Sequence, residues 1–219
     1  MSTLIRLFEA GAEYFHLRKP NSSAEDIRRY IDSIPQVYHS KIVLHQHYDL
    51  LDVYDIKGIH FTSQTINQID KYINSPSSKT VGLTPPSDHK NECKSHKRTD
   101  EGVSPTVRDF HKSCSTHSFD EIDDLGHDFD YVFLSPIFDS ISKLGYLSNF
   151  DEPSLSAYLK TSGRNIVALG GIDSVTASKC ADMGFCGVAS LGYIWNPALN
   201  GDSDKSIDNF KSLTEAYRS

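Results

Sequence analysis

The nine residues Asn165–Asp173, NIVALGGID, restrict the fold of this chain more than any other stretch. Ile166–Leu169 is a short apolar run, partly β-branched, which predicts a buried strand. Gly170 and Gly171 predict a tight turn, and Asp173 is a suitable N-cap for a helix over SVTASKCADMG. A buried strand followed at once by a turn and a helix is typical of a parallel α/β sheet.

A second unit of the same kind follows at Gly184–Trp195, GFCGVASLGYIW. Two successive glycine turns, late in a chain of this length, indicate the phosphate-binding site that (β/α)₈ barrels build after their last two strands. Glycine lets the backbone approach an anion closely, and a helix N-terminus offers unpaired N–H groups. The alternative is two ordinary glycine loops, which are common in parallel-sheet folds.

Strand-like runs alternate with helical patterns along the chain, which predicts one parallel sheet with right-handed connections. The first pattern is helical and not strand-like, because Leu4, Ile5 and Phe8 share one face before Gly11. We therefore expect an α/β fold of the TIM (β/α)₈ type that lacks the first strand. The expected strands lie near residues 13–18, 41–46, 57–61, 110–115, 130–134, 165–169 and 186–191.

Two later helices carry start signals of the capping-box kind. Ser23 with Asp26, and Ser118 with Glu121, have the spacing at which each side chain can bond the backbone N–H of the other residue. Residues 75–108 differ from their surroundings, since they are rich in Ser, Lys, Asp, His and Pro and poor in apolar residues. We interpret them as a polar insertion in a single domain spanning residues 1–219. A linker between two domains is the alternative.

Composition excludes several classes of partner. The 219 residues carry a net charge of −7, which gives no indication of binding to nucleic acid or to an anionic membrane. No apolar run approaches the length of a membrane-spanning helix, and there is no signal-peptide pattern. The four cysteines lack metal-site spacing, so we expect a reducing, cytoplasmic environment. Assembly into a homo-oligomer stays open.

Polar side chains gather where the predicted strands end, at the edge that carries catalytic groups in TIM-type barrels. Arg18 can hold a phosphate through two parallel hydrogen bonds, and Lys143 can act as a mobile charge. The alternatives are a surface salt bridge for Arg18 and a solvated loop lysine for Lys143. The set at the strand ends is His16, Arg18, Lys19, His45, Gln46, His47, His60, Ser115, Thr116, His117, Ser135, Pro136, Lys143, Gly170, Gly171, Ser190 and Gly192.

The histidines of this set allow three interpretations. His45 and His47 form an H-x-H pair at one strand end, and His60 follows the next strand. Zinc or another transition metal can use imidazoles so placed, although no carboxylate is obviously convergent. General acid or base chemistry by one histidine is the favoured functional interpretation, because an imidazole titrates near neutrality. The third interpretation is that the histidines cap strands through hydrogen bonds.

Seven segments, in this order, resemble the thiamine phosphate synthase and thiazole tautomerase (TenI-type) family. They are FHLRKP, IVLHQHYDLL, KGIHF, SCSTHSFDEI, DYVFLSPIFDSISK, VALGGID and GFCGVASLGYIW. The resemblance implies a TIM barrel that joins an aminopyrimidine diphosphate to a thiazole phosphate, or isomerises the thiazole. It thus implies a cytoplasmic transferase of thiamine biosynthesis whose partners are small phosphorylated heterocycles, with neither nucleic acid nor membrane among them.

The resemblance also assigns roles residue by residue. Arg18 matches the basic motif that binds the pyrimidine diphosphate, while Lys19 is shifted by one position. Ser115 and Lys143 match a serine and a diphosphate-contacting lysine, and Gly192 replaces a common serine. The assigned catalytic residues are Arg18, Lys143 and Ser115, and the assigned substrate- and phosphate-binding residues are His16, Lys19, His45, Gln46, Gly170, Gly171 and Gly192.

The chain departs from the family at the positions that carry its chemistry. His45–Gln46 and Thr65 stand where the family holds Mg²⁺ with acidic ligands, so no metal site is assigned although Mg²⁺ is expected for the family. Pro136 stands where the tautomerase has its histidine. The alternatives are therefore a non-catalytic or regulatory phosphate-binding barrel, a tautomerase-like isomerase, or an isomerase of another phosphate-binding barrel family. The missing first strand predicts an opened or irregularly closed barrel.

Overall fold

The computed structural model describes residues 2–73, 110–139, 148 and 150–219. Seven parallel strands form one sheet, and their order in the sheet is their order along the chain. The predicted α/β fold is confirmed, and each of the seven expected strands is present. The strands are β1 (Phe15–Leu17), β2 (Ile42–Leu44), β3 (Gly58–Phe61), β4 (His111–Thr116), β5 (Tyr131–Leu134), β6 (Ile166–Leu169) and β7 (Gly187–Ala189).

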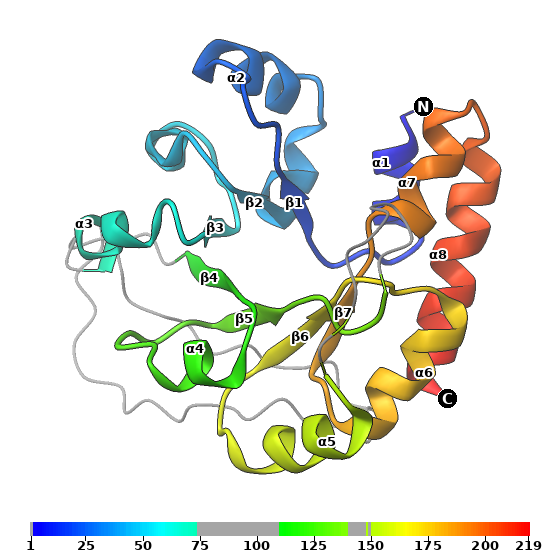
Figure 1. Cartoon of the computed structure of the whole chain (residues 1–219). Helices are drawn as coiled ribbons and strands as arrows, with labels where there is room; N and C mark the ends of the chain where they lie inside the picture. The colour runs from blue at the N-terminus through cyan, green and yellow to red at the C-terminus, as the bar shows by residue number, and fades with distance from the viewer. Residues whose placement is uncertain (1, 74–109, 140–147, 149) are drawn as a thin grey trace, which may run out of the picture.

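Helices connect successive strands, as the predicted alternation requires (Figure 1). The expected insertion, residues 75–108, lies outside the described residues. The α-helices are α1 (Thr3–Glu9), α2 (Ala24–Asp32), α3 (Ile69–Ile73), α4 (Phe119–Asp123), α5 (Glu152–Thr161), α6 (Ser174–Met183), α7 (Gly192–Leu199) and α8 (Ser203–Arg218). The 3-10 helices are η1 (Gln36–Lys41), η2 (Tyr48–Asp52) and η3 (Ile66–Gln68).

The sheet curls into a half-barrel and does not close (Figure 1). Within the described residues, neither the outer edge of β1 nor that of β7 pairs with another strand. The curvature is nevertheless strong enough for Tyr131, at the start of β5, to hydrogen bond His16 of β1. The expectation of a TIM-type sheet that stays open is confirmed for the described residues, in which seven parallel strands form a half-barrel.

The two faces of the sheet have different chemistry, because successive residues of a strand point to opposite sides. On the outer face, Leu17, Ile59 and Leu134 are buried in the main apolar core with the helices. TIM-barrel interiors are usually filled with branched aliphatic side chains. Here the inner face is polar and aromatic instead. Its contacting residues include His16, His45, His60, Ser113, Ser115, Tyr131 and Phe133.

Helix α8 packs against α1, α6 and α7 and so joins the first helix to the last βα units (Figure 1). The predicted apolar face of α1 is confirmed for Leu4 and Phe8, which are buried. Ile5 is only half-buried, and Leu7 is the third buried residue of this helix. Amphipathic packing of α1 on α8 therefore attaches the N-terminal helix to the C-terminal part of the half-barrel.

The structure confirms one expected capping box and modifies the other. Ser23 and Asp26 bond reciprocally at the start of α2. Ser118 accepts the N–H of Glu121, but the Glu121 carboxylate accepts from the backbone N–H of His117. The first turn of α4 is therefore capped by Ser118, but the return hydrogen bond of the motif reaches His117, one residue before the N-cap.

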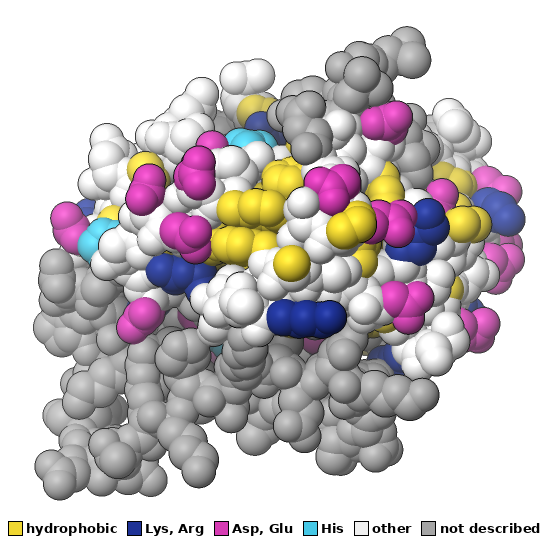
Figure 2. Space-filling model, turned by 60° about the horizontal axis from the view of Figure 1, so that its bottom comes forward, with side chains coloured by type: hydrophobic (Ala, Val, Ile, Leu, Met, Phe, Trp, Pro, Cys, Tyr) yellow, Lys and Arg dark blue, Asp and Glu magenta, His cyan; other side chains and the backbone are white. Residues whose placement is uncertain are grey.

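The surface carries mixed chemistry. Figure 2 shows a face on which acidic side chains are scattered around a group of hydrophobic ones, with a few basic side chains between them. This distribution agrees with the net charge of −7 and presents no continuous basic surface on that face. In the described part of the chain, every helix is too short or too polar to cross a membrane.

Candidate functional site

Three histidines from neighbouring strands meet inside the half-barrel. His16 belongs to β1, His45 directly follows β2 and His60 belongs to β3. Each is at an inward position of its strand, so the curled parallel sheet brings the three rings together. One ring nitrogen from each histidine lies within 4.8 Å of those of the other two. The ring centroids of His45 and His60 are 4.2 Å apart. We call these three residues the histidine cluster.

His16 connects the cluster to the far side of the barrel interior. Its Nδ1 lies 3.0 Å from Nε2 of His45, and its Nε2 lies 2.7 Å from the hydroxyl of Tyr131. A contact between two neutral imidazoles requires one nitrogen to donate and the other to accept, so the proton positions on the three side chains are coupled. Nδ1 of His45 is buried and has no hydrogen-bond partner among the described residues.

His60 is fixed by two serines of β4. Its Nδ1 lies 2.8 Å from Oγ of Ser113, and its Nε2 lies 2.8 Å from Oγ of Ser115. The ring of Phe133 lies against the cluster, with its centroid 5.0 Å from that of His60 and 4.7 Å from that of His16. Hydrogen bonds and an aromatic neighbour thus define the orientation of His60, which is completely buried.

Burial keeps the histidine cluster neutral. Desolvation lowers the pKa of His45 to about 3, and the positive charge of Arg18 adds to the effect. Burial, followed by repulsion from His45, also lowers the pKa values of His16 and His60 well below the ordinary value. Desolvation raises the pKa of Tyr131, so its hydroxyl stays protonated. Neutral imidazoles in this arrangement can exchange hydrogen bonds or bind a metal, but their lowered pKa values make them weak bases near neutral pH.

The two histidines of the H-x-H sequence do not converge. His47 has a left-handed backbone, with φ of 53°, and its Nε2 lies 2.9 Å from the carbonyl oxygen of Ser22. His47 is therefore attached to the loop after β1, while His45 points into the barrel. Of the three histidines considered as possible metal ligands, His45 and His60 meet inside the half-barrel, and His16 takes the third place there instead of His47.

The residues assigned to the pyrimidine side of the site form contacts between loops. The side-chain amide of Gln46 donates to the carbonyl oxygens of Lys19, at 2.8 Å, and Ser22, at 3.4 Å. Nζ of Lys19 lies 4.0 Å above the ring centroid of Tyr30 in α2. Arg18 is exposed and forms no ion pair with an acidic side chain in the described ranges. Its positive charge acts on His45 and contributes to the lowered pKa of that imidazole.

The other assigned residues lie further along the sheet. Ser115 bonds His60 and so belongs to the histidine cluster's surroundings. Nδ1 of His117 lies 2.8 Å from the carbonyl oxygen of Ser135, which agrees with the strand-capping interpretation. Lys143 lies outside the described residues.

Gly170 and Gly171 form the expected turn after β6, with φ of 96° and 67°. A Cβ at Gly170 would lie 2.8 Å from Cα of Pro136, and one at Gly171 would lie 2.5 Å from the carbonyl oxygen of Asp139. Both glycines are therefore required by the left-handed backbone and by the close approach of the loop after β5. The predicted turn is confirmed. Close contact with the loop after β5 is a second reason why both positions are glycine.

A hydrogen bond connects the turns of the last two βα units, which are β6 with α6 and β7 with α7. Asp173 caps α6 and accepts from two backbone N–H groups of its first turn. By contrast, no described side chain caps α7, which begins at Gly192. Oγ of Ser190 donates to the carbonyl oxygen of Ile172 across the two turns at 2.8 Å. The uncapped N-terminus of α7 beside the glycine turn is suited to an anion such as a phosphate.

The sequence patterns did not identify three residues of the barrel interior, which are Ser113, Tyr131 and Phe133. Each lies two residues from another interior position of its own strand, in the series Ser113–Ser115 and Tyr131–Phe133. The period of two in a strand was the signal that could have found them. The sequence does not show this alternation clearly, because residues on both faces of β4 and β5 are buried.

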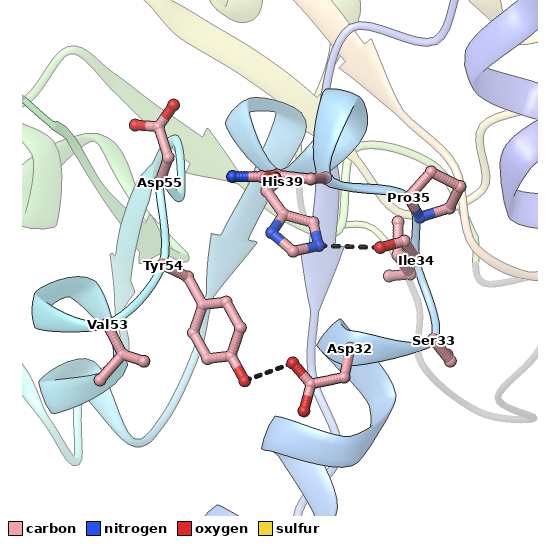
Figure 3. A pocket seen from close by; sticks show the side chains of 9 residues that line it. Asp32, Ser33, Ile34, Pro35, His39, Val53, Tyr54 and Asp55 are labelled. Carbon is pink, nitrogen blue, oxygen red and sulfur yellow. Dashed lines mark hydrogen bonds between the residues drawn. The ribbon is translucent and has the colours of Figure 1, made fainter.

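A separate hollow of about 570 Å³ opens near the residues that precede β2 and β3 (Figure 3). His39 points into this region and its Nε2 lies 2.9 Å from the carbonyl oxygen of Ile34. The hydroxyl of Tyr54 donates to Asp32 at 2.7 Å. Because these polar groups already satisfy each other, the hollow is a poorer candidate site than the opposite edge of the sheet.

Comparison with solved structures places this arrangement among known barrels. A thiamine phosphate pyrophosphorylase from Bacteroides thetaiotaomicron superposes with a TM-score of 0.68 and 28% sequence identity, over 97% of this chain and 88% of that one. The chain is structurally similar to thiamine phosphate pyrophosphorylases. The Pyrococcus furiosus thiamine phosphate pyrophosphorylase gives a TM-score of 0.67 at 14% identity, over 98% of this chain and 87% of that one.

Other TIM-barrel-like proteins share the fold alone. The tryptophan synthase alpha chain of Legionella pneumophila subsp. pneumophila gives a TM-score of 0.55 at 13% identity, over 98% of this chain and 84% of that one. No family model matches the chain, and no curated protein matches it. The half-barrel therefore resembles the pyrophosphorylases in its fold, and this structural similarity extends along nearly the whole chain.

The converging side chains do not fit the Mg²⁺ ion that the family resemblance implies. Mg²⁺ prefers oxygen ligands in octahedral geometry, commonly carboxylates, phosphates and water. The one converging group of possible ligands within the described residues consists of His16, His45 and His60. Imidazole nitrogens suit transition metals instead.

Proposed function

We propose that this protein is a transferase of the thiamine phosphate synthase type, which binds an aminopyrimidine diphosphate and a thiazole phosphate. The observation that carries this proposal is the similarity to the Bacteroides thetaiotaomicron thiamine phosphate pyrophosphorylase over 97% of the chain. Cytoplasmic thiamine biosynthesis would be its setting, and small phosphorylated heterocycles its partners.

The turn at Gly170 and Gly171, together with the start of α7 at Gly192, supports a phosphate site. The left-handed glycines allow close approach of the backbone, and the uncapped helix adds its positive dipole end. Oγ of Ser190 holds the two units together. The phosphate of the thiazole substrate would bind here, which leaves the inner face of β1–β3 for the pyrimidine.

Arg18 would stabilise the negative charge that grows on a departing diphosphate. It is the exposed cation beside the histidine cluster, and a guanidinium binds phosphate oxygens through parallel hydrogen bonds. His16 and His45 would orient the substrate as neutral hydrogen-bonding groups. Ser115 would act through His60, which it holds in place.

A second function, a non-catalytic phosphate-ligand-binding barrel, is favoured by a specific observation. The amide of Gln46 is occupied by backbone carbonyl oxygens of the loop after β1, so this position contributes structure in place of an acidic ligand. A regulatory protein would keep the phosphate site but would not form a product.

Isothermal titration with thiazole phosphate, with thiamine phosphate and with the aminopyrimidine diphosphate tests binding. We expect saturable binding that is weakened at least about 10-fold by Arg18→Gln for ligands carrying a diphosphate. Arg6→Gln is the matched control, since Arg6 pairs with Asp204 of α8 and belongs to none of the assigned binding residues, so its loss should change affinity much less. No binding of either phosphate at millimolar concentration would overturn the proposal.

An assay of thiamine phosphate formation then separates the two functions. Both substrates are supplied with and without added Mg²⁺, and the product is quantified by chromatography. Product formation supports the transferase, whereas binding without product supports the non-catalytic barrel.

A further inference from the structure

We propose that His16, His45 and His60 form a binding site for a first-row transition metal ion, with Zn²⁺ as the best fit, and that its fourth coordination position is open to an oxygen ligand. This inference is independent of the proposed transferase function, because it rests on the three imidazoles alone. It also differs from the H-x-H site considered in the sequence, which would have used His47.

The spacing of the ligand atoms fits a small ion. One nitrogen of each ring lies within 4.8 Å of the others, and Nδ1 of His16 is 3.0 Å from Nε2 of His45. Zinc–nitrogen bonds of about 2.0–2.1 Å in a tetrahedron separate two ligand atoms by about 3.4 Å. The His16 and His45 rings therefore need to separate by only a few tenths of an ångström, whereas ligand atoms as far apart as 4.8 Å would approach by about 1.4 Å on metal binding.

The surroundings of the rings resemble the outer shell of a metal site. A histidine ligand usually donates its second ring N–H to another group, which fixes the tautomer and the ring orientation. Tyr131 bonds Nε2 of His16, and this leaves Nδ1, on the His45 side, with its lone pair for a metal. His60 has a serine hydroxyl at each nitrogen, so a metal that binds one nitrogen displaces that hydroxyl, while the other nitrogen keeps its partner.

The cluster is also incomplete without an additional group. Nδ1 of His45 is buried and unpaired within the described residues. A water or an ion in its neighbourhood is one explanation for a buried polar atom without a partner. In the metal-bound form, rotation of the His45 ring about its χ2 axis exchanges the positions of its nitrogen and carbon atoms, and so allows either nitrogen to reach the ion.

The donor set selects the kind of metal. Three neutral imidazoles and no carboxylate favour Zn²⁺, Co²⁺, Ni²⁺ or Cu²⁺ over Mg²⁺ and Ca²⁺. Three protein ligands are the number found in catalytic zinc sites, where the fourth position holds water or substrate. His16 and His45 are half-buried, so that position is reached from the open side of the cluster. The cation Arg18 nearby favours an anionic fourth ligand, such as hydroxide or a phosphate oxygen.

Cobalt titration of the full chain tests the site. Protein freed of metal with a chelator is titrated with Co²⁺ while visible absorption is recorded, and Zn²⁺ is then added as a competitor. We expect a saturable band of tetrahedral intensity at a single Co²⁺ per chain, which Zn²⁺ abolishes. His16→Gln and His45→Gln should each weaken Co²⁺ binding by at least about 100-fold, since even outer-shell changes cost 10- to 100-fold.

His47→Gln and His117→Gln are the matched controls, because both remove a histidine near the same strand ends but outside the cluster. Circular dichroism verifies that each variant is folded. The proposal is overturned if wild-type protein gives no saturable Co²⁺ band, or if the control variants lose binding as strongly as His16→Gln and His45→Gln. The titration contains no phosphorylated ligand, so its failure leaves the transferase proposal intact, and a failed ligand titration leaves the metal site intact.

Discussion

The hydroxyl of Tyr131 lies 2.7 Å from Nε2 of His16, although 115 residues separate the two along the chain. Tyr131 begins β5 and His16 lies in β1, so the bond crosses the inside of the half-barrel from its first strand to its fifth. Strand pairing alone connects only neighbours. This polar contact therefore holds the curvature of the sheet as well as the orientation of His16.

Tyr131→Phe should destabilise the protein by about 1–3 kcal/mol, because it leaves a nitrogen of His16 unpaired in the interior. Urea denaturation followed by circular dichroism measures the free energy of unfolding. Tyr54→Phe is the matched control, since it removes a hydroxyl that bonds Asp32 at an exposed position. Equal losses in the two variants would show that the interior bond has no special role in stabilising the curved sheet.

Gly171→Ala should lower the free energy of unfolding by about 3 kcal/mol, which combines the cost of a left-handed alanine with that of overpacking. Its φ is 67°, and the added Cβ would lie 2.6 Å from Cβ of Phe138. Gly163→Ala isolates the backbone part, because Gly163 has a similar φ of 72° but no atom lies within 4 Å of the place that an added Cβ would take.

We therefore expect Gly163→Ala to cost about 1 kcal/mol in the same denaturation measurement. A Gly171→Ala variant as stable as Gly163→Ala would mean that the loop after β5 does not pack closely on the turn. A large difference between the two supports the close approach that the structure shows.

Stability should fall as the pH is lowered from neutrality, because buried histidines resist protonation. Burial, assisted by the charge of Lys57, lowers the pKa of His111 to about 4. In the unfolded chain this group titrates near 6.5, so the unfolded state binds more protons between the two values. His111 alone should therefore remove about 2 kcal/mol of unfolding free energy between about pH 7 and pH 5.

Urea denaturation at both pH values checks this expectation. His111→Gln should reduce the loss on acidification, while the remaining dependence reflects the histidine cluster, whose pKa values are also lowered. His117→Gln, which removes an exposed histidine, is the control. A His111→Gln protein with the same pH dependence as wild type would contradict the assignment.

Short-range patterns in the sequence were sufficient to predict the strands and helices. The apolar run before Gly170 and the N-cap Asp173 each depend on residues a few positions apart, so a strand, a turn and a helix could be predicted in order. The reciprocal box at Ser23 was predictable for the same reason. The alternation of such units implied a parallel sheet, which the structure confirms.

The tertiary structure alone decided which polar residues meet. The sequence placed His45 next to His47, but a left-handed residue turns His47 toward Ser22, while the curvature of the sheet brings His16 in. Tyr131 joins them from four strands away. Sequence patterns encode which face of a strand a residue occupies, with a period of two. They do not encode how far the sheet bends, since that depends on packing between every strand and helix at once.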